Sequence, residues 1–340
     1  MAATEHKILV IGPSWIGDMV MAQALFKTLK SENADVIIDV LALDWTKPLL
    51  ARMPEVNIAI SMPVSHGVFG WNMRKKLGHS LRDQHYQQAI VLPNSWKSAL
   101  IPWFANIPIR TGWRGEQRYG LLNDMRILDK QALPMMVQRY VSLANPASQA
   151  HSPPSYQAPL MLAQQPKKEF NFLLDPDKKR LLFCPGAEFG PAKQWPASHF
   201  SGLANIYLAQ GWQLLIMGSK ADADIAKQIM QLIPDHHQSD VFNLCGKTIL
   251  GDAIDLLSTA DLVVSNDSGL MHISAALQKN LMVIYGPTSP SFTPPLASNS
   301  QIVQLDVECG PCFQKSCPEG HHKCMQDLSS DIVFNQINKS

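Results

Sequence analysis

Short apolar runs alternate with amphipathic segments along the first half of the chain. Four runs, at residues 7–12, 36–42, 56–61 and 88–92, have the length of buried β-strands. After the first of them, residues 19–30 carry apolar side chains at helical spacing. Because strands that alternate with helices usually pair in parallel, this half predicts an α/β domain built from βαβ units.

A proline-rich stretch at residues 145–168 breaks this pattern and has the composition of a loop or interdomain connection. The alternation then restarts, with strand-like runs at residues 180–184, 213–217, 241–244, 262–264 and 281–285. We therefore predict two similar α/β domains, residues 1–165 and 166–325, and a final helix within residues 326–340. Ligands of such folds bind beyond the carboxyl ends of the strands, so the loops that follow the strands should carry the site.

The turn at Asp267, Ser268 and Gly269 is the first candidate site. It follows the strand-like run at 262–264 and leads into a segment with helical spacing. The free N–H groups and the dipole of a helix start favour an anion, and Gly269 lets a phosphate approach the backbone, so we predict that this turn holds a ligand diphosphate. The alternative is that Asp267 or Ser268 only caps the helix and that His272 is an ordinary buried histidine.

The loop at residues 12–18 (GPSWIGD) carries a carboxylate where a phosphate-binding loop would carry a lysine. It also lacks the G-x-G-x-x-G pattern of dinucleotide-binding proteins, so neither common nucleotide motif fits. Asp18 is then a candidate general base for a substrate hydroxyl. The alternative role is an N-cap for a helix that begins at Met19.

Two further loops of the second half contain charged residues. The loop at residues 185–196 ends in Lys193, which is suited to a phosphate leaving group but is also compatible with a surface position. Beyond the next strand, Asp222 is the candidate acceptor of hydrogen bonds from a ribose. Asp224 is interpreted as structural, because the dipole favours acids in the first turn of a helix without any metal.

The composition is that of a soluble globular protein, with 46% hydrophobic and 17% charged residues in a chain of 340. No apolar run is long enough to span a bilayer, and residues 1–6 lack the layout of a signal peptide, so we expect a cytoplasmic protein. The net charge of +1 gives no indication of a nucleic-acid partner. Residues 71–130 are nevertheless basic, with ten Lys or Arg against four Asp or Glu, a local charge of +6.

Six segments match one enzyme family in order and at compatible spacing. They are residues 11–18 (IGPSWIGD), 93–95 (PNS), 110–113 (RTGW), 119–124 (YGLLND), 185–193 (PGAEFGPAK) and 266–272 (NDSGLMH). These segments resemble the ADP-heptose–lipopolysaccharide heptosyltransferases. The resemblance implies a GT-B fold, in which two Rossmann-like domains with parallel sheets face each other across a cleft and the second domain holds most of the nucleotide sugar. In this fold the final helix packs back on the first domain.

The implied reaction is an inverting, metal-independent transfer of L-glycero-D-manno-heptose from ADP-heptose to the first heptose of the lipopolysaccharide inner core. Asp18 would take the proton of the acceptor hydroxyl, and Lys193 would stabilise the departing diphosphate. The donor would be held by Glu188, Lys193, Asp222, Asp267, Ser268, Gly269 and His272, and the acceptor by Ser14, Lys97, Arg110, Arg114 and Arg118. Beyond ADP-heptose, no cofactor is expected, and the enzyme is expected to act as a monomer.

The basic segment fits such an acceptor, which carries carboxylates and phosphates. Arg74, Lys75 and Lys76 would attract these groups together with the expected acceptor-binding residues. Aromatic residues nearby suggest peripheral contact with the inner face of the cytoplasmic membrane; they are Trp71, Trp96, Trp103 and Phe104. The alternative is a solvated basic surface above core aromatics.

Four cysteines near the end of the chain form a second type of candidate site. Cys309, Cys312, Cys317 and Cys324 have spacings compatible with a structural zinc ion, with His321 and His322 between the last two. The implied mechanism needs no metal and the spacing is irregular, so zinc is not the favoured interpretation. Cys184 and Cys245 lie in strand-like runs and are interpreted as small core residues.

Three other functions remain open at this stage. They are another heptose-transfer step of lipopolysaccharide synthesis, a nucleotide-sugar 2-epimerase of the same fold, and a non-catalytic nucleotide-sugar binding module. An epimerase would need no acceptor, and a binding module would tolerate the loss of Asp18.

Overall fold

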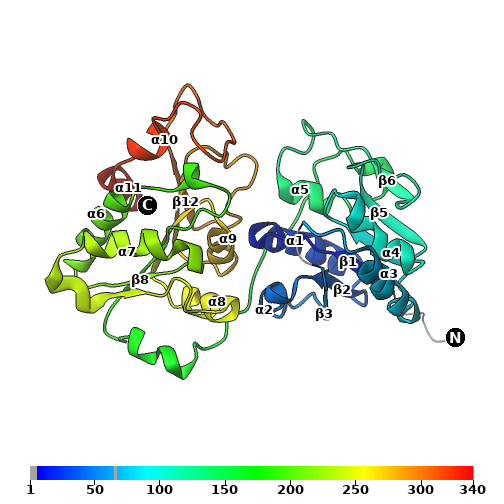
Figure 1. Cartoon of the computed structure of the whole chain (residues 1–340), viewed down its shortest axis with the longest axis horizontal. Coiled ribbons are helices and arrows are strands. Elements are labelled where there is room, and N and C mark those ends of the chain that lie inside the picture. The colour runs from blue at the N-terminus through cyan, green and yellow to red at the C-terminus, as the bar shows by residue number, and fades with distance from the viewer. Residues whose placement is uncertain (1–5, 65–66, 340) are drawn as a thin grey trace. The chain divides into compact units, whose positions relative to one another are not determined.

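The computed structural model of the protein describes residues 6–64 and 67–339. The chain divides into two compact units, residues 1–162 and 163–340 (Figure 1). The division lies within the proline-rich stretch, close to the expected domain boundary.

The first unit contains one six-stranded sheet in which every strand pair is parallel. The sheet order is β3-β2-β1-β4-β5-β6. Its strands are β1 (Lys7–Ile11), β2 (Ile37–Ala42), β3 (Ile58–Ser61), β4 (Gln88–Val91), β5 (Ile109–Trp113) and β6 (Asp124–Arg126). The helices are α1 (Ile16–Glu32), α2 (Lys47–Leu50), α3 (Trp71–Ser80), α4 (Leu100–Phe104) and α5 (Met136–Val141).

The second unit repeats this arrangement with the sheet order β12-β11-β10-β7-β8-β9, again all parallel. Its strands are β7 (Arg180–Cys184), β8 (Gln213–Ile216), β9 (Val241–Asn243), β10 (Leu262–Asn266), β11 (Leu281–Tyr285) and β12 (Ser300–Gln304). Its helices are α6 (Ala197–Leu208), α7 (Ala223–Gln231), α8 (Leu250–Ser258), α9 (Gly269–Ala276), α10 (Lys323–Gln326) and α11 (Ser330–Ile337).

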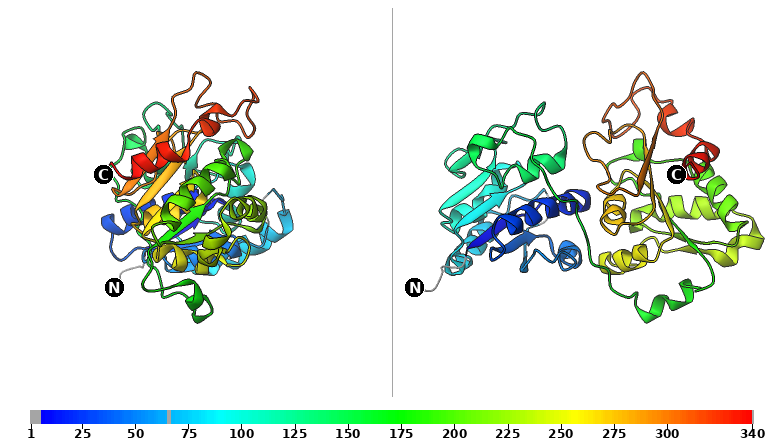
Figure 2. Two further views of the ribbon diagram at one scale, coloured as in Figure 1. Left: turned by 90° about the vertical axis from the view of Figure 1, so that its left-hand side faces the viewer. Right: turned by 180° about the vertical axis from the view of Figure 1, so that it is seen from behind.

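The strand order reverses once in each sheet, between β1 and β4 and between β7 and β10. Since parallel strands are joined by right-handed crossovers, a reversal sends the connections to opposite faces, and helices lie on both faces of each sheet (Figure 2). The loops on either side of a reversal therefore diverge at the carboxyl end of the sheet, which is where such folds bind ligands. The predicted α/β class and all nine predicted strands are confirmed.

Strands β5, β6 and β12 escaped the sequence analysis because polar residues or a glycine interrupt them. Strand β6 has three residues, and β12 is an edge strand with polar residues at both ends. No helix in the described parts of the chain is long and apolar enough to cross a membrane.

The packing of the final helix is defined within the second unit, and its expected contact with the first domain stays a prediction. Helix α11 packs on α6 of the second unit, and its Val333 is completely buried in that unit's core. Phe334 makes an edge contact with the ring of Tyr207 on α6, with ring centroids 5.8 Å apart. The apolar face of α11 therefore belongs to the core of the second unit.

Candidate functional site

The loop after β7 brings Lys193 to the start of α9. The Lys193 Nζ lies 2.6 Å from Asp267 Oδ2 and 3.3 Å from the Asp267 carbonyl oxygen. Thr288 donates a hydrogen bond of 2.7 Å to the same carboxylate oxygen. Only 12% of the Lys193 side chain and 6% of the Asp267 side chain are exposed, so Lys193 is not a surface lysine.

Asn266 holds the two loops at the strand reversal together. Its side-chain amide donates to the Pro185 carbonyl at 2.8 Å, and its side-chain carbonyl accepts from the Trp195 backbone N–H at 3.3 Å. Asn266 and Trp195 are both fully buried. A buried amide whose two ends are both hydrogen-bonded fixes the spacing of the groups it joins, so Asn266 sets the position of Lys193 relative to Asp267.

Helix α9 begins at Gly269, directly after Ser268 at the N-cap position. The Ser268 side chain makes no capping hydrogen bond, and its hydroxyl lies 3.2 Å from that of Ser265. The first N–H groups of a helix have no partner within the helix, and its dipole is positive there. Together with the ammonium of Lys193, this end of α9 favours an anionic ligand.

His272 lies one turn further into α9 and is almost completely buried. Burial lowers its pKa to about 4, the charge of Asp267 opposes this shift, and the charge of Lys193 adds to it. The imidazole is therefore neutral at pH 7 and can offer a hydrogen bond but no positive charge.

Asp222 lies between the loops that follow β7 and β8. Its carboxylate accepts hydrogen bonds from the Ser219 backbone N–H and hydroxyl, at 2.7 and 2.8 Å. A Cβ atom on Gly186 would lie 2.8 Å from the same carboxylate, so only glycine allows this approach of the loop. Beneath it, burial raises the pKa of Cys245 to about 12, and the charge of Asp222 adds to the shift. Both Cys184 and Cys245 are buried, as predicted.

Glu188 is exposed in a turn closed by the hydrogen bond from Gly190 N–H to the Ala187 carbonyl, at 2.9 Å. The neighbouring Phe189 ring lies 4.9 Å from the Lys193 ammonium. This turn therefore also supports Lys193.

In the first unit, Asp18 occupies the first turn of α1, which begins at Ile16 with Trp15 at the N-cap. A capping role for Asp18 at a helix start near Met19 is therefore ruled out. The buried Tyr140 of α5 forms a side-chain hydrogen bond with Asp18. Burial raises the pKa of Tyr140 well above its usual value, and the negative charge of Asp18 adds to this, so the hydroxyl stays protonated and donates to the carboxylate.

Three expected acceptor residues follow the carboxyl ends of neighbouring strands. Ser14 follows β1, Lys97 lies in the short 3-10 helix Trp96–Ala99 after β4, and Arg114 follows β5. Ser14 and Lys97 are half-buried, and Arg114 is exposed. All three thus lie at the edge of the sheet that also carries Asp18.

Two expected acceptor residues have structural roles instead. Arg110 lies near the amino end of β5, at the opposite edge, and its guanidinium donates to the Leu121 and Ile107 carbonyls at 2.6 and 2.5 Å. Arg118 has no exposed surface and bonds to the carbonyls of Trp113 and Pro93 and to Ser98. The Arg118 guanidinium is therefore enclosed, whereas the half-buried Arg110 is held by backbone carbonyls at the amino end of its strand. The sequence positions of Arg110 and Arg118 did not indicate that both side chains would donate hydrogen bonds to backbone carbonyls.

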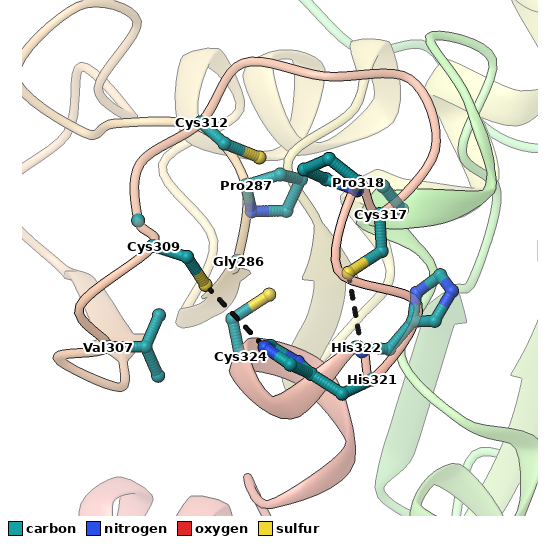
Figure 3. Close-up of a pocket in the computed structure, with 12 residues that line it drawn as sticks. Gly286, Pro287, Val307, Cys309, Cys312, Cys317, Pro318, His321, His322 and Cys324 are labelled. Carbon is teal, nitrogen blue, oxygen red and sulfur yellow. Dashed lines mark hydrogen bonds between the residues drawn. The ribbon is translucent and has the colours of Figure 1, made fainter.

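The loop of residues 307–324, here called the cysteine loop, borders a small pocket of about 20 Å³ (Figure 3). Burial raises the pKa of Cys324, and the nearby sulfurs of the other three cysteines of the loop add to the shift. All six cysteines are free thiols. Among the described residues, no group of three or more His, Cys, Asp or Glu side chains is arranged to hold a metal ion, and the structural zinc ion stays a hypothesis.

The cysteine loop instead contacts the loop that carries Lys193. The Ala192 N–H donates to the Lys315 carbonyl at 3.0 Å, and the Phe313 N–H donates to the Pro287 carbonyl at 2.7 Å. A Cβ atom on Gly190 would lie 2.4 Å from the same Lys315 carbonyl oxygen. The segment that carries Lys193 is thus supported by the cysteine loop.

Sequence reasoning missed Asn266 and Tyr140. Asn266 stands next to Asp267 in a matched segment, so a buried polar residue at the end of an apolar strand was the available signal. Tyr140 lies far from Asp18 in sequence, and no local pattern connects the two.

Comparisons with known proteins identify the family. The family model for glycosyltransferase family 9 (heptosyltransferase) matches residues 74–323. The chain is 45% identical to lipopolysaccharide heptosyltransferase 2 of Escherichia coli K12, over 98% of this chain and 97% of that protein. It is 48% identical to lipooligosaccharide heptosyltransferase 2 of Haemophilus ducreyi, over 98% and 99%. The solved structure of E. coli ADP-heptose lps heptosyltransferase II matches with a TM-score of 0.86 and 43% identity, covering 98% of this chain and 97% of that one.

The buried neutral state of His272 predicts a pH dependence of stability. Its folded-state pKa of about 4 lies below the ordinary value of 6.5, so between these values the unfolded state binds more protons. The free energy of unfolding contributed by this group should therefore fall by about 2 kcal/mol from pH 7 to pH 5.

Urea unfolding of the wild type and of His272→Gln at both pH values measures this contribution. The His272→Gln variant should lose that part of the pH dependence, whereas the exposed control His236→Gln should keep it. An equal pH dependence in wild type and His272→Gln would contradict the prediction.

Proposed function

Because the chain belongs to glycosyltransferase family 9, the heptosyltransferases, we propose that it transfers L-glycero-D-manno-heptose from ADP-heptose to the first heptose of the lipopolysaccharide inner core, with inversion at the anomeric carbon. The observation that carries the proposal is the placement of Lys193 and Asp267 at the start of α9 in a chain with this full-length similarity. The relatives named heptosyltransferase 2 support the second transfer step over its alternatives.

The proposed donor site lies at the strand reversal of the second unit. Lys193 and the N-terminus of α9, with Ser268 and Gly269, bind the diphosphate, and neutral His272 adds a hydrogen bond. Asp267 binds heptose hydroxyls and Asp222 binds the ribose, since each carries a carboxylate held by neighbouring donors. Glu188 completes the donor site from the exposed turn before Lys193.

The proposed reaction is a single displacement. The acceptor oxygen forms a bond to the anomeric carbon, Asp18 takes the hydroxyl proton, and the bond to ADP breaks with its electron pair remaining on the diphosphate. Negative charge therefore grows on ADP as the reaction proceeds, and Lys193 with α9 stabilises the transition state more than the bound donor. The hydrogen bond from Tyr140 orients the Asp18 carboxylate.

The proposed acceptor site lies at the carboxyl edge of the first sheet and contains Ser14, Lys97 and Arg114. It does not use Arg118, which is buried, or Arg110, which lies near the amino end of β5. Lys97 and Arg114 supply charge for the carboxylates and phosphates of an inner-core acceptor. Since that acceptor is attached to lipid, we propose a cytoplasmic enzyme that works at the inner face of the cytoplasmic membrane, without a cofactor and as a monomer.

Release of ADP from ADP-heptose tests the proposed function directly. Purified protein in the presence of a chelator should release ADP only with a Kdo–lipid A acceptor that already carries one heptose, because the acceptor hydroxyl is the nucleophile. The acceptor without heptose is the control. Release with that control, or without any acceptor, would contradict the second transfer step.

Replacing Asp18 by Asn should lower kcat by about 10²–10⁴-fold, the usual contribution of a positioned general base. ADP-heptose affinity, measured by calorimetry, should stay near that of the wild type. Asp35→Asn, on an exposed acid of the same unit, is the matched control. Turnover within about threefold of the wild type would remove Asp18 from the proposed mechanism.

Replacing Lys193 by Met should lower kcat/KM for ADP-heptose by about 10²–10³-fold, because it removes a charge that faces the leaving group. ADP itself should also bind more weakly in a direct binding measurement. The control Lys227→Met changes an exposed lysine on α7 and should leave both quantities unchanged. Equal effects of the two substitutions would mean that Lys193 has no specific role at the diphosphate.

A further inference from the structure

A cluster of aromatic rings reaches the surface of the first unit at α3 and α4. Phe69, Trp71 and Trp103 are 49%, 40% and 41% exposed, and we call them the aromatic surface. They are connected through ring contacts: Phe69 stacks on Trp71 with centroids 6.0 Å apart, and Trp71 and Trp103 contact the buried Phe104 at 5.1 and 4.9 Å. Helices α3 and α4 pack against each other in the same unit (Figure 1).

The side chain of Arg74 fixes the backbone of the residues before α3. Arg74 is buried, and its guanidinium donates to the Phe69 and Val68 carbonyls at 2.7 and 3.3 Å and to the Lys97 carbonyl at 3.3 Å. The exposed side chains of Phe69 and of Val68, which is 50% exposed, therefore project from a fixed backbone. Large apolar side chains that gather on a surface mark an interaction site more often than single ones do.

Positive charge surrounds the aromatic surface. Lys75 and Lys76 are exposed on α3, and the exposed Arg82 is fixed by a hydrogen bond of 2.9 Å from its Nε to the Phe104 carbonyl. From residue 67 to residue 115 the sequence contains seven Lys or Arg and a single acid, Asp83. A protein partner for this surface would need a strongly acidic face, whereas an anionic bilayer presents negative headgroups above apolar chains.

We propose that the aromatic surface docks the first unit on a bilayer that contains anionic phospholipid. Trp and Phe side chains insert at the level of the headgroups, and Lys75, Lys76 and Arg82 bind the phosphates around them. This inference rests on the proposed function for its purpose, because a lipid-linked acceptor is found only at a membrane. Its physical basis, exposed rings surrounded by basic residues, is independent of the reaction.

Docking at this surface also bears on the acceptor site. Arg74 connects the backbone before α3 to the carbonyl of Lys97, and both helices follow strands whose carboxyl ends form the edge that carries Asp18. A bilayer bound at α3 and α4 would thus bring the sugars at the level of its headgroups close to Lys97. The fixed backbone between α3 and Lys97 would determine how deeply the first unit enters the headgroup layer.

Sedimentation with vesicles tests the proposal. The full-length wild type should bind vesicles of phosphatidylethanolamine and phosphatidylglycerol, and bind phosphatidylcholine vesicles at least about tenfold more weakly. Trp71→Ser/Trp103→Ser and Lys75→Glu/Lys76→Glu should each weaken binding to the anionic vesicles by about tenfold or more. The matched controls are Trp45→Ser, on a tryptophan that is 49% exposed, and Lys220→Glu/Lys227→Glu, with the same change of net charge.

Activity provides a second readout with two acceptors. Both surface variants should lose transfer to an acceptor embedded in vesicles. Trp71→Ser/Trp103→Ser should keep wild-type transfer to the same oligosaccharide freed of lipid. Loss of transfer to the lipid-free acceptor as well would overturn the proposal, because the rings would then bind sugar. If neither acceptor is used by the wild type, the proposed function fails, while vesicle binding still decides the docking surface.

Hydrogen exchange in the wild type removes any dependence on folding of the variants. Anionic vesicles should slow the exchange of backbone amides in residues 67–82 and 100–105 and leave residues 223–231 of α7 unchanged. Unchanged exchange in α3 and α4, or wild-type vesicle binding in both surface variants, would overturn the proposal.

Discussion

The single reversal of strand order in each sheet is the constraint on which the site depends. Parallel strands force every connection to cross a face of the sheet, and the reversal makes two neighbouring connections leave in opposite directions. The loops on either side of that point are left without a helix between them. In the second unit they carry Lys193 and Asp267, and in the first unit they lead to Asp18 in the first turn of α1 and to Lys97. The candidate site residues thus lie next to the strand reversals, where no helix covers the loops.

In the second unit, the opposite charges of Lys193 and Asp267 are buried, and each of them has a partner. The ammonium of Lys193 and the carboxylate of Asp267 pair directly, Thr288 satisfies the same carboxylate, and the adjacent His272 stays neutral. A charged imidazole there would oppose Lys193 and require solvation that burial denies it. The Lys193–Asp267 pair carries no net charge, and its ammonium lies next to the positive end of α9, an arrangement suited to an anion that gains charge during a reaction.

Much of this organisation could be predicted from sequence, because it depends on local patterns. Apolar runs placed nine of the strands, and charged residues after those runs identified the loops that carry Asp18, Lys193 and Asp267. Contacts between distant segments could not be predicted. Arg118 looks like any other basic residue of its segment until the fold surrounds it with carbonyl groups, and the pairing of Tyr140 with Asp18 joins two helices far apart in sequence. The packing of α11 on α6 likewise depends on which apolar surface of the folded unit is available to cover, and the sequence of α11 does not contain that information.

The cysteine loop supports the Lys193 segment through backbone atoms, from the Ala192 N–H to the Lys315 carbonyl. A backbone contact places few demands on the identity of the side chain at residue 315 but strong demands on Gly190, where any Cβ would meet that carbonyl. The side chain at residue 315 can therefore change without loss of this contact, whereas residue 190 has to remain glycine. Insertions or deletions that move the loop would shift the Lys193 segment, and with it the proposed donor site, without changing any residue of that site.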